Sequence, residues 1–324
     1  NRVRRRLRRA HSGRTCSVDG HIFHGYTVSA DPATLLFTPV RAVPNPASNG
    51  HCDVRARNGD DRRSARARFF GPQGRLFGIF DEPDTPSDRG VVLCYPHGAD
   101  YDSAFRSFRI LGTRLSRAGF HVLRFDYLGT GDSWGDTEDA SIGQWTEDTV
   151  AAIHELRTSC DLRQVAVVGL RLGATVAAFA AADCGAVDQL VAWAPVFEGR
   201  DYLDGLRALH QQWLKDERRS GRAKSAADDE LLGYRLTPSI RGDLESLSLL
   251  SLSKLPAPSV YLVNQEPSAD RPEFAAWLRA RGANVDTDVI DGPTIWSRSP
   301  SMPEASVPNR SLQMIVNWIA GASR

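Results

Sequence analysis

The sequence has few lysines, no paired cysteine motif and no long apolar run. Only three of its 40 cationic residues are lysine, a bias that we attribute to a GC-rich genome and that says little about partners. The five cysteines show no CxxC spacing, which favours a reduced, cytoplasmic protein without a cysteine-based metal site. No stretch approaches about 18 apolar residues, so no membrane span is predicted.

Positive charge is concentrated at the start of the chain. Residues 1–68 hold 14 arginines against five acidic residues, whereas the remainder holds 26 basic against 34 acidic residues. No apolar segment follows the opening NRVRRRLRRAHSGR, so export is not expected. Residues 1–66 also lack sustained periodicity, and we predict a basic, disordered extension rather than a nucleic-acid-binding arm.

Strand-like and helix-like segments alternate through the remaining domain, residues 67–324. The pattern predicts strands near 75–80, 90–95, 120–125, 164–169, 188–194, 259–264 and 284–290. It predicts helices near 103–118, 143–158, 173–183, 272–281 and 308–320. Several strands are continuously apolar, which is typical of a parallel sheet covered by helices on both faces. The fold class is therefore α/β, with a mostly parallel sheet.

A charged segment at about 198–255 interrupts this alternation. Its sequence, including LRALHQQWLKDERRSGRAKSAADDELLGY, indicates a mainly helical insertion. We predict that the insertion forms a lid over the sheet.

The stretch QVAVVGLRLGATVAAFAA, residues 164–181, reads as a strand, a glycine-flanked turn and a helix. Serine hydrolases of the α/β class present their nucleophile on such a turn as G-x-S-x-G. Here Gly169 and Gly173 are present, but Arg171 occupies the position of the serine. A guanidinium stays protonated at physiological pH and cannot attack an acyl carbon.

From about Phe69 onward, the chain resembles the α/β-hydrolase superfamily. The segments that carry the resemblance include FFGPQGRLFGIF, VVLCYPHGADY, AGFHVLRFDYLGTGDSWGD, VVGLRLGAT, WAPVFEGRDYL and LLGYRLTPSI. Within the superfamily it resembles the exosortase-associated, or serine-aminopeptidase-like, hydrolases, many of which carry GLRLGA at the elbow. The resemblance implies an α/β-hydrolase fold with the nucleophile replaced.

The resemblance also places the other site residues. His97 and Gly98 occupy the loop that supplies one oxyanion N–H, and Leu172 supplies the second. Asp270 matches the position of the catalytic acid, with Glu266 nearly as well placed, and Glu304 stands where the family has its histidine.

The sequence contains no histidine after His210, although the family's histidine follows the last strand. A standard acyl-enzyme mechanism therefore lacks both its nucleophile and its general base. The glycine-rich DYLGTGDSWG matches neither a dinucleotide fingerprint nor a phosphate loop, and no metal-ligand spacing appears. We predict no cofactor and no metal.

Three residues offer alternative chemistry. Ser133 lies in a literal G-x-S-x-G, but no helix follows directly, so a bracing role in the turn is favoured over a nucleophilic one. Cys94 ends an apolar strand, and a core position is favoured over a reactive thiolate. His210 lies in the insertion, where a solvated helix histidine is favoured over a catalytic base.

Arg171 leaves two interpretations open. With the oxyanion donors and Asp100 and Asp126 nearby, it would bind an anionic or acylated small molecule at a helix N-terminus. Alternatively it forms an internal salt bridge to one of five acids: Asp100, Asp126, Glu198, Asp270 or Glu304. The protein is then either a degenerate hydrolase that binds a ligand, or an enzyme in which Asp100, Asp126 or Glu304 activates water.

Overall fold

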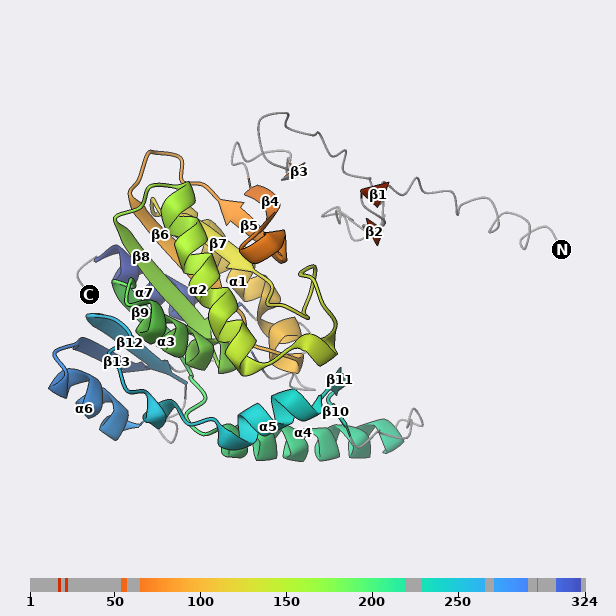
Figure 1. Cartoon of the computed structure of the whole chain (residues 1–324). Coiled ribbons are helices and arrows are strands. Elements are labelled where there is room, and N and C mark those ends of the chain that lie inside the picture. The colour runs from red at the N-terminus through yellow and green to blue at the C-terminus, as the bar shows by residue number, and fades with distance from the viewer. Residues whose placement is uncertain are drawn as a thin grey trace.

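The computed structural model describes residues 17–18, 21–22, 54–56, 65–219, 229–265, 271–290, 296 and 307–321. Within these residues the chain forms a nine-stranded sheet and seven α-helices (Figure 1). No helix of the described part is both long enough and apolar enough to cross a bilayer.

Six neighbouring strands of the sheet are parallel, and three antiparallel strands extend one edge. The parallel strands, in sheet order, are β13 (Asn284–Val289), β12 (Ser259–Asn264), β9 (Gln189–Trp193), β8 (Gln164–Leu170), β6 (Arg89–Cys94) and β7 (His121–Phe125). The antiparallel strands are β5 (Leu76–Asp81), β4 (Ala65–Phe70) and β3 (Val54–Ala56). All seven predicted strands are present, and the α/β fold class with a mostly parallel sheet is confirmed.

The five predicted helices are also present, and they cover both faces of the sheet (Figure 1). One face carries α2 (Ile142–Ser159), α3 (Leu172–Cys184) and α6 (Pro272–Ala280). The other carries α1 (Ala99–Arg117) and α7 (Asn309–Ala320). The apolar side chains of α1 recur at helical spacing and pack in one core cluster with those of α7. Each face of the sheet therefore has its own core.

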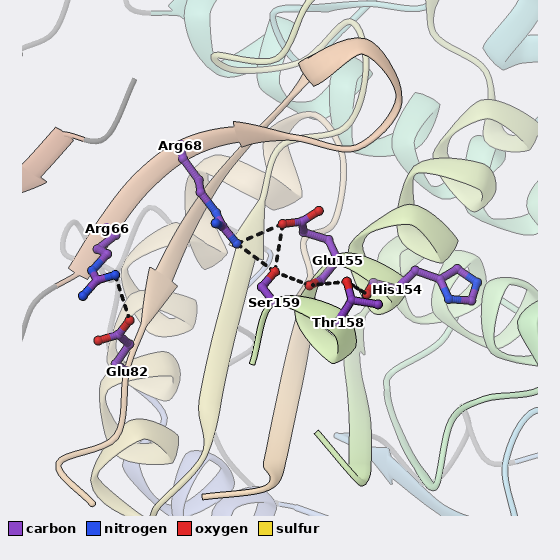
Figure 2. A network of polar contacts seen from close by, with 7 residues as sticks. All are labelled: Arg66, Arg68, Glu82, His154, Glu155, Thr158 and Ser159. Atoms are coloured by element: carbon purple, nitrogen blue, oxygen red, sulfur yellow. Dashed lines mark hydrogen bonds and ion pairs between the residues drawn. The ribbon is translucent and has the colours of Figure 1, made fainter. Parts of the chain in front are cut away.

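Strand β4 was not among the predicted strands, because its sequence ARARFF looks like a continuation of the basic leader. Figure 2 shows how its arginines are accommodated. Arg68 donates to Glu155 Oε1 and Ser159 Oγ of α2, at 2.9 Å each, and its guanidinium lies 4.0 Å from the ring centre of Phe80. Arg66 pairs with Glu82 at 3.4 Å. The partners lie far away in the sequence, so the local pattern could not predict this strand.

The described residues of the charged insertion include two α-helices, α4 (Gly199–Arg219) and α5 (Pro238–Ser246), with β10 (Glu230–Leu231) and β11 (Tyr234–Arg235) between them in the sequence. Thr237 caps α5 by accepting from the N–H of Ile240 at 3.2 Å, and Pro238 begins the helix. Figure 1 shows α4 and α5 side by side below the sheet. The predicted helical character of the insertion is confirmed.

Candidate functional site

Strand β8 passes into helix α3 through a single strained residue, Arg171. Its backbone has φ 54° and ψ −125°, a region that residues other than glycine rarely adopt. Backbone hydrogen bonds hold the turn: Arg171 N–H donates to Trp193 O at 2.9 Å, and Arg171 O accepts from Ala174 N–H at 3.0 Å and from Thr175 N–H at 3.4 Å. The strand, turn and helix of a nucleophile elbow are therefore present, with an arginine at the apex.

The two glycines of the elbow are required by close backbone contacts. A Cβ atom on Gly169 would lie 2.4 Å from Ala174 Cα, and one on Gly173 would lie 2.2 Å from Tyr95 O. The start of α3 therefore sits directly against the end of β6. This contact brings the elbow close to the loop that contains His97 and Gly98.

We predict that the strain at the apex can be measured as a difference between two variants. Arg171→Gly and Arg171→Ala lose the same side-chain contacts, but only glycine adopts this backbone conformation without strain. The glycine variant should therefore exceed the alanine variant in free energy of unfolding by about 1–3 kcal/mol. Urea denaturation of both proteins measures the difference. Equal stability, or a more stable alanine variant, would show that the apex residue is not strained.

The side chain of Arg171 is enclosed by one acid and two aromatic rings. Its Nε lies 3.5 Å from Asp100 Oδ2 of α1, and its guanidinium carbon lies 5.2 Å from the ring centre of Tyr202 and 5.1 Å from that of Trp296. At this distance the ion pair is longer than a good hydrogen bond, and Nε has no hydrogen-bond partner among the described residues. A quarter of the side chain remains exposed.

Asp100 is the buried member of this pair. It also accepts a hydrogen bond from the Tyr202 hydroxyl, at 3.0 Å. Burial raises the pKa of Asp100, while the charge of Arg171 and the hydrogen bond from Tyr202 oppose the rise. Of the acids considered as internal partners of Arg171, the structure places Asp100 beside it. Glu198, another of them, instead accepts from Ser248 Oγ at 2.7 Å.

The predicted oxyanion residues flank the elbow through their backbones. Gly98, with φ 66°, is the N-cap of α1, and Leu172 is the first residue of α3. The first N–H groups of a helix lack an intrahelical acceptor, so Leu172 can donate to a ligand. The side chain of His97 packs against Trp145, with 4.7 Å between ring centres, and burial lowers its pKa to about 4. This imidazole is therefore neutral at pH 7.

The loop after β7 is braced internally. Asp126 Oδ2 accepts from the N–H of Asp132 at 3.0 Å, and the Tyr101 hydroxyl lies 3.4 Å from Oδ1. Burial raises the pKa of Asp126 to about 6. Ser133 Oγ donates to Asp126 O at 2.5 Å and accepts from Phe77 N–H at 2.8 Å. These contacts occupy the Ser133 hydroxyl, as expected for a residue that braces a turn.

Two other candidate residues lie in packed surroundings. Burial raises the pKa of Cys94 to about 12, so its thiol stays protonated and belongs to the core. The interpretation of His210 as a solvated helix histidine is wrong: its side chain is buried, and Nδ1 accepts from the N–H of Leu232 at 3.0 Å. The turn between β10 and β11 folds onto this face of α4, a contact that helical periodicity alone does not reveal.

Asp270 and Glu304, the residues at the acid and histidine positions, lie outside the described residues, as does Glu266. Their assignments stay predictions. Conversely, Tyr202 and Trp296 were not singled out from the sequence, although both rings contact Arg171. The only signal for Tyr202 was its place in the segment WAPVFEGRDYL, directly after a strand end, and Trp296 gave no signal.

Comparisons with known proteins agree with the observed architecture. Residues 87–229, less than half of the chain, match the model of the Hydrolase_4 family, described as serine aminopeptidase, S33. Among solved structures, Est1E from Butyrivibrio proteoclasticus is similar at 14% identity, with a TM-score of 0.50 and coverage of 79% of this chain and 96% of that chain. The Pyrococcus furiosus esterase Pf2001 is similar at 18% identity and a TM-score of 0.49, covering 91% of this chain and 98% of that chain.

A putative hydrolase from Agrobacterium vitis S4 is similar at 16% identity and a TM-score of 0.48, covering 89% of this chain and all of that chain. The comparison with curated proteins gave no match. At these identities the structural likeness concerns the fold and not the activity. The chain thus has an α/β-hydrolase fold, and its residues 87–229 are similar to the serine aminopeptidase S33 family.

Proposed function

We propose that this protein is a degenerate hydrolase that binds a small anionic or acylated ligand, through a carboxylate or phosphate, at its elbow. The observation that carries the proposal is the arginine at the strained apex. Its guanidinium cannot serve as a nucleophile, but it binds carboxylate and phosphate through paired hydrogen bonds. The GLRLGA elbow further supports placing the chain in the exosortase-associated branch.

The contacts of Arg171 suit exchange between an internal and an external anion. The 3.5 Å separation from Asp100 leaves Nε without a hydrogen bond, and a quarter of the side chain is exposed. The hydroxyl of Tyr202 continues to satisfy Asp100 when Arg171 turns to a ligand. Burial raises the pKa of Asp100 and the charge of Arg171 opposes the rise, so this pKa would rise further once the guanidinium turns to a ligand. Anion binding is therefore stronger at lower pH.

The insertion acts as a lid in this proposal. Tyr202 belongs to α4 and contacts both Arg171 and Asp100. Tyr234 of β11 lies close to Gly98, 3.7 Å from where a Cβ atom would stand. Parts of the insertion far apart in the sequence therefore meet the elbow and the oxyanion loop. Excluding water there would strengthen the pairing of an anion with the guanidinium.

We expect that this site can be detected with simple anions. Acetate, succinate, inorganic phosphate and pyrophosphate are tested in a thermal-shift panel, and the strongest is titrated by calorimetry. Arg171→Gln should weaken binding at least about tenfold, because the charge-assisted hydrogen bonds are lost. Arg207→Gln, which changes an exposed arginine of α4, is the matched control and should leave affinity unchanged.

Two results would contradict the proposal. One is an affinity for all four anions that is unchanged by Arg171→Gln. The other is turnover of short acyl esters together with fluorophosphonate labelling that disappears in Ser133→Ala. The second result would favour the alternative function, an active hydrolase or acyl-transfer enzyme with non-standard catalytic residues. The raised pKa of Asp126 is the observation on which that alternative rests.

A further inference from the structure

A pocket lies on the α1 side of the sheet, and Arg171 is not among its lining residues. Its volume is about 350 Å³. Much of its wall is aromatic: Phe77 of β5, Tyr95 after β6, Tyr101 and Phe105 of α1, and Phe125 of β7. The rings of Tyr95, Tyr101 and Phe105 form a cluster, with ring centres 5.0 to 6.0 Å apart. Phe105 is 42% exposed, so part of its ring is open to solvent.

The charged residues that line this pocket leave a net negative charge. Arg124 lines it, but its Nε and Nη2 both donate to Asp81 Oδ2, at 3.1 and 3.0 Å, so that this pair contributes no net charge. Asp126 and Asp132 also line the pocket. The carboxylate of Asp126 is held by neutral donors, a backbone N–H and the Tyr101 hydroxyl. The aromatic wall therefore carries an excess of negative charge.

We propose that this pocket binds an organic ammonium ion. Aromatic faces attract cations through the ring quadrupole, and quaternary ammonium groups are typically bound by several rings together. A nearby carboxylate adds attraction without requiring a hydrogen bond from the ligand. An anion would be repelled by Asp126 and Asp132, and a neutral ligand would gain no charge–charge attraction from them. The volume suits a small ligand such as choline.

The titration of Asp126 gives the binding a pH dependence. Burial raises its pKa to about 6, so its negative charge is largely present at pH 7 and is lost at pH 5. The groups that face it are Tyr101 from α1, Arg124 from β7 and Asp132 from its own loop. Burial also raises the pKa of Tyr101, which stays neutral, and Arg124 stays charged and paired. Affinity for the cation therefore falls as the pH falls through about 6.

The experiment compares choline with 3,3-dimethylbutan-1-ol, its neutral isostere, by calorimetry on the whole protein. Choline should bind at least about fivefold more tightly, and Phe105→Ala and Asp126→Asn should each weaken choline binding by about fivefold. The asparagine side chain retains an oxygen that can accept from Asp132 N–H, so the hydrogen bond that holds the loop is kept. Trp213→Ala, at a ring that is also 42% exposed, is the matched control and should have no effect.

Thermal melting of each variant establishes that it is folded before binding is compared. Equal affinity for choline and its isostere would overturn the proposal, as would the absence of measurable binding by either. Choline binding that survives both Phe105→Ala and Asp126→Asn would place the cation elsewhere and overturn it too. Arg171→Gln should leave choline binding intact, so this proposal and that of the anion site can fail separately.

Discussion

Gly173→Ala is expected to lower the free energy of unfolding by at least about 3 kcal/mol, or to prevent folding. The added Cβ atom would lie 2.2 Å from Tyr95 O and 2.6 Å from Cys94 O. Both are backbone atoms, Cys94 O in the last residue of a central strand and Tyr95 O in the residue after it, so neither can move aside without shifting the sheet. The helix would have to withdraw from β6, and the elbow geometry would be lost with it. Urea denaturation monitored by circular dichroism measures the effect.

The chain provides a matched control for this substitution. Gly242 lies inside helix α5, and a Cβ atom there would meet nothing within 4 Å. Gly242→Ala should therefore be neutral or stabilising by up to about 1 kcal/mol, because alanine favours the helix. If Gly173→Ala is as stable as Gly242→Ala, the close approach of α3 to β6 is not present in solution.

Asp81→Ala is expected to cost about 3–5 kcal/mol of folding free energy. The guanidinium of Arg124 is buried, with 7% of its side chain exposed, and Asp81 accepts two of its N–H groups. Helix α1 covers the pair, since a Cβ atom on Gly112 would lie 3.1 Å from Arg124 Nε. Removing the carboxylate would leave an uncompensated charge between α1 and the sheet. Chemical denaturation at pH 7 checks the size of the loss.

An exposed ion pair and a double variant test whether the burial of Arg124 causes the loss of stability in Asp81→Ala. Asp88 and Arg163 are 3.6 Å apart and more than half exposed, so Asp88→Ala should change stability by less than about 1 kcal/mol. Replacing both buried partners, as Asp81→Ala with Arg124→Met, should recover much of the loss because no charge is left buried. A double variant no more stable than Asp81→Ala would refute this explanation.

The sequence could predict the elbow but not the surroundings of its arginine. The G-x-R-x-G turn follows from a strand, two glycines and a helix that are contiguous in the chain. From the sequence alone, any of five acids could be the partner of Arg171. The choice could not be made because the ion pair to Asp100 joins segments that only the packing of α1 and α3 brings together. The rings of Tyr202 and Trp296 come from two further parts of the chain, 31 and 125 residues after Arg171.

The same distinction explains the other differences between sequence and structure. Local sequence patterns predicted the parallel strands and the five helices that cover the sheet, because the periodicity of apolar residues reflects which face of an element is buried. They missed β4, whose arginines are accommodated by Glu82, Glu155 and the ring of Phe80. They also misjudged His210, which is buried by a turn 22 residues away.

The sequence by itself determined that the apex of the elbow carries a permanent cation and that no histidine follows residue 210. Both facts are properties of the covalent structure of the chain, so folding cannot change them. Only the tertiary structure decided that Asp100 lies beside Arg171 and that an aromatic, acidic pocket opens on the α1 side of the sheet. Both depend on side chains from separate elements, whose positions are set by packing across the two faces of the sheet.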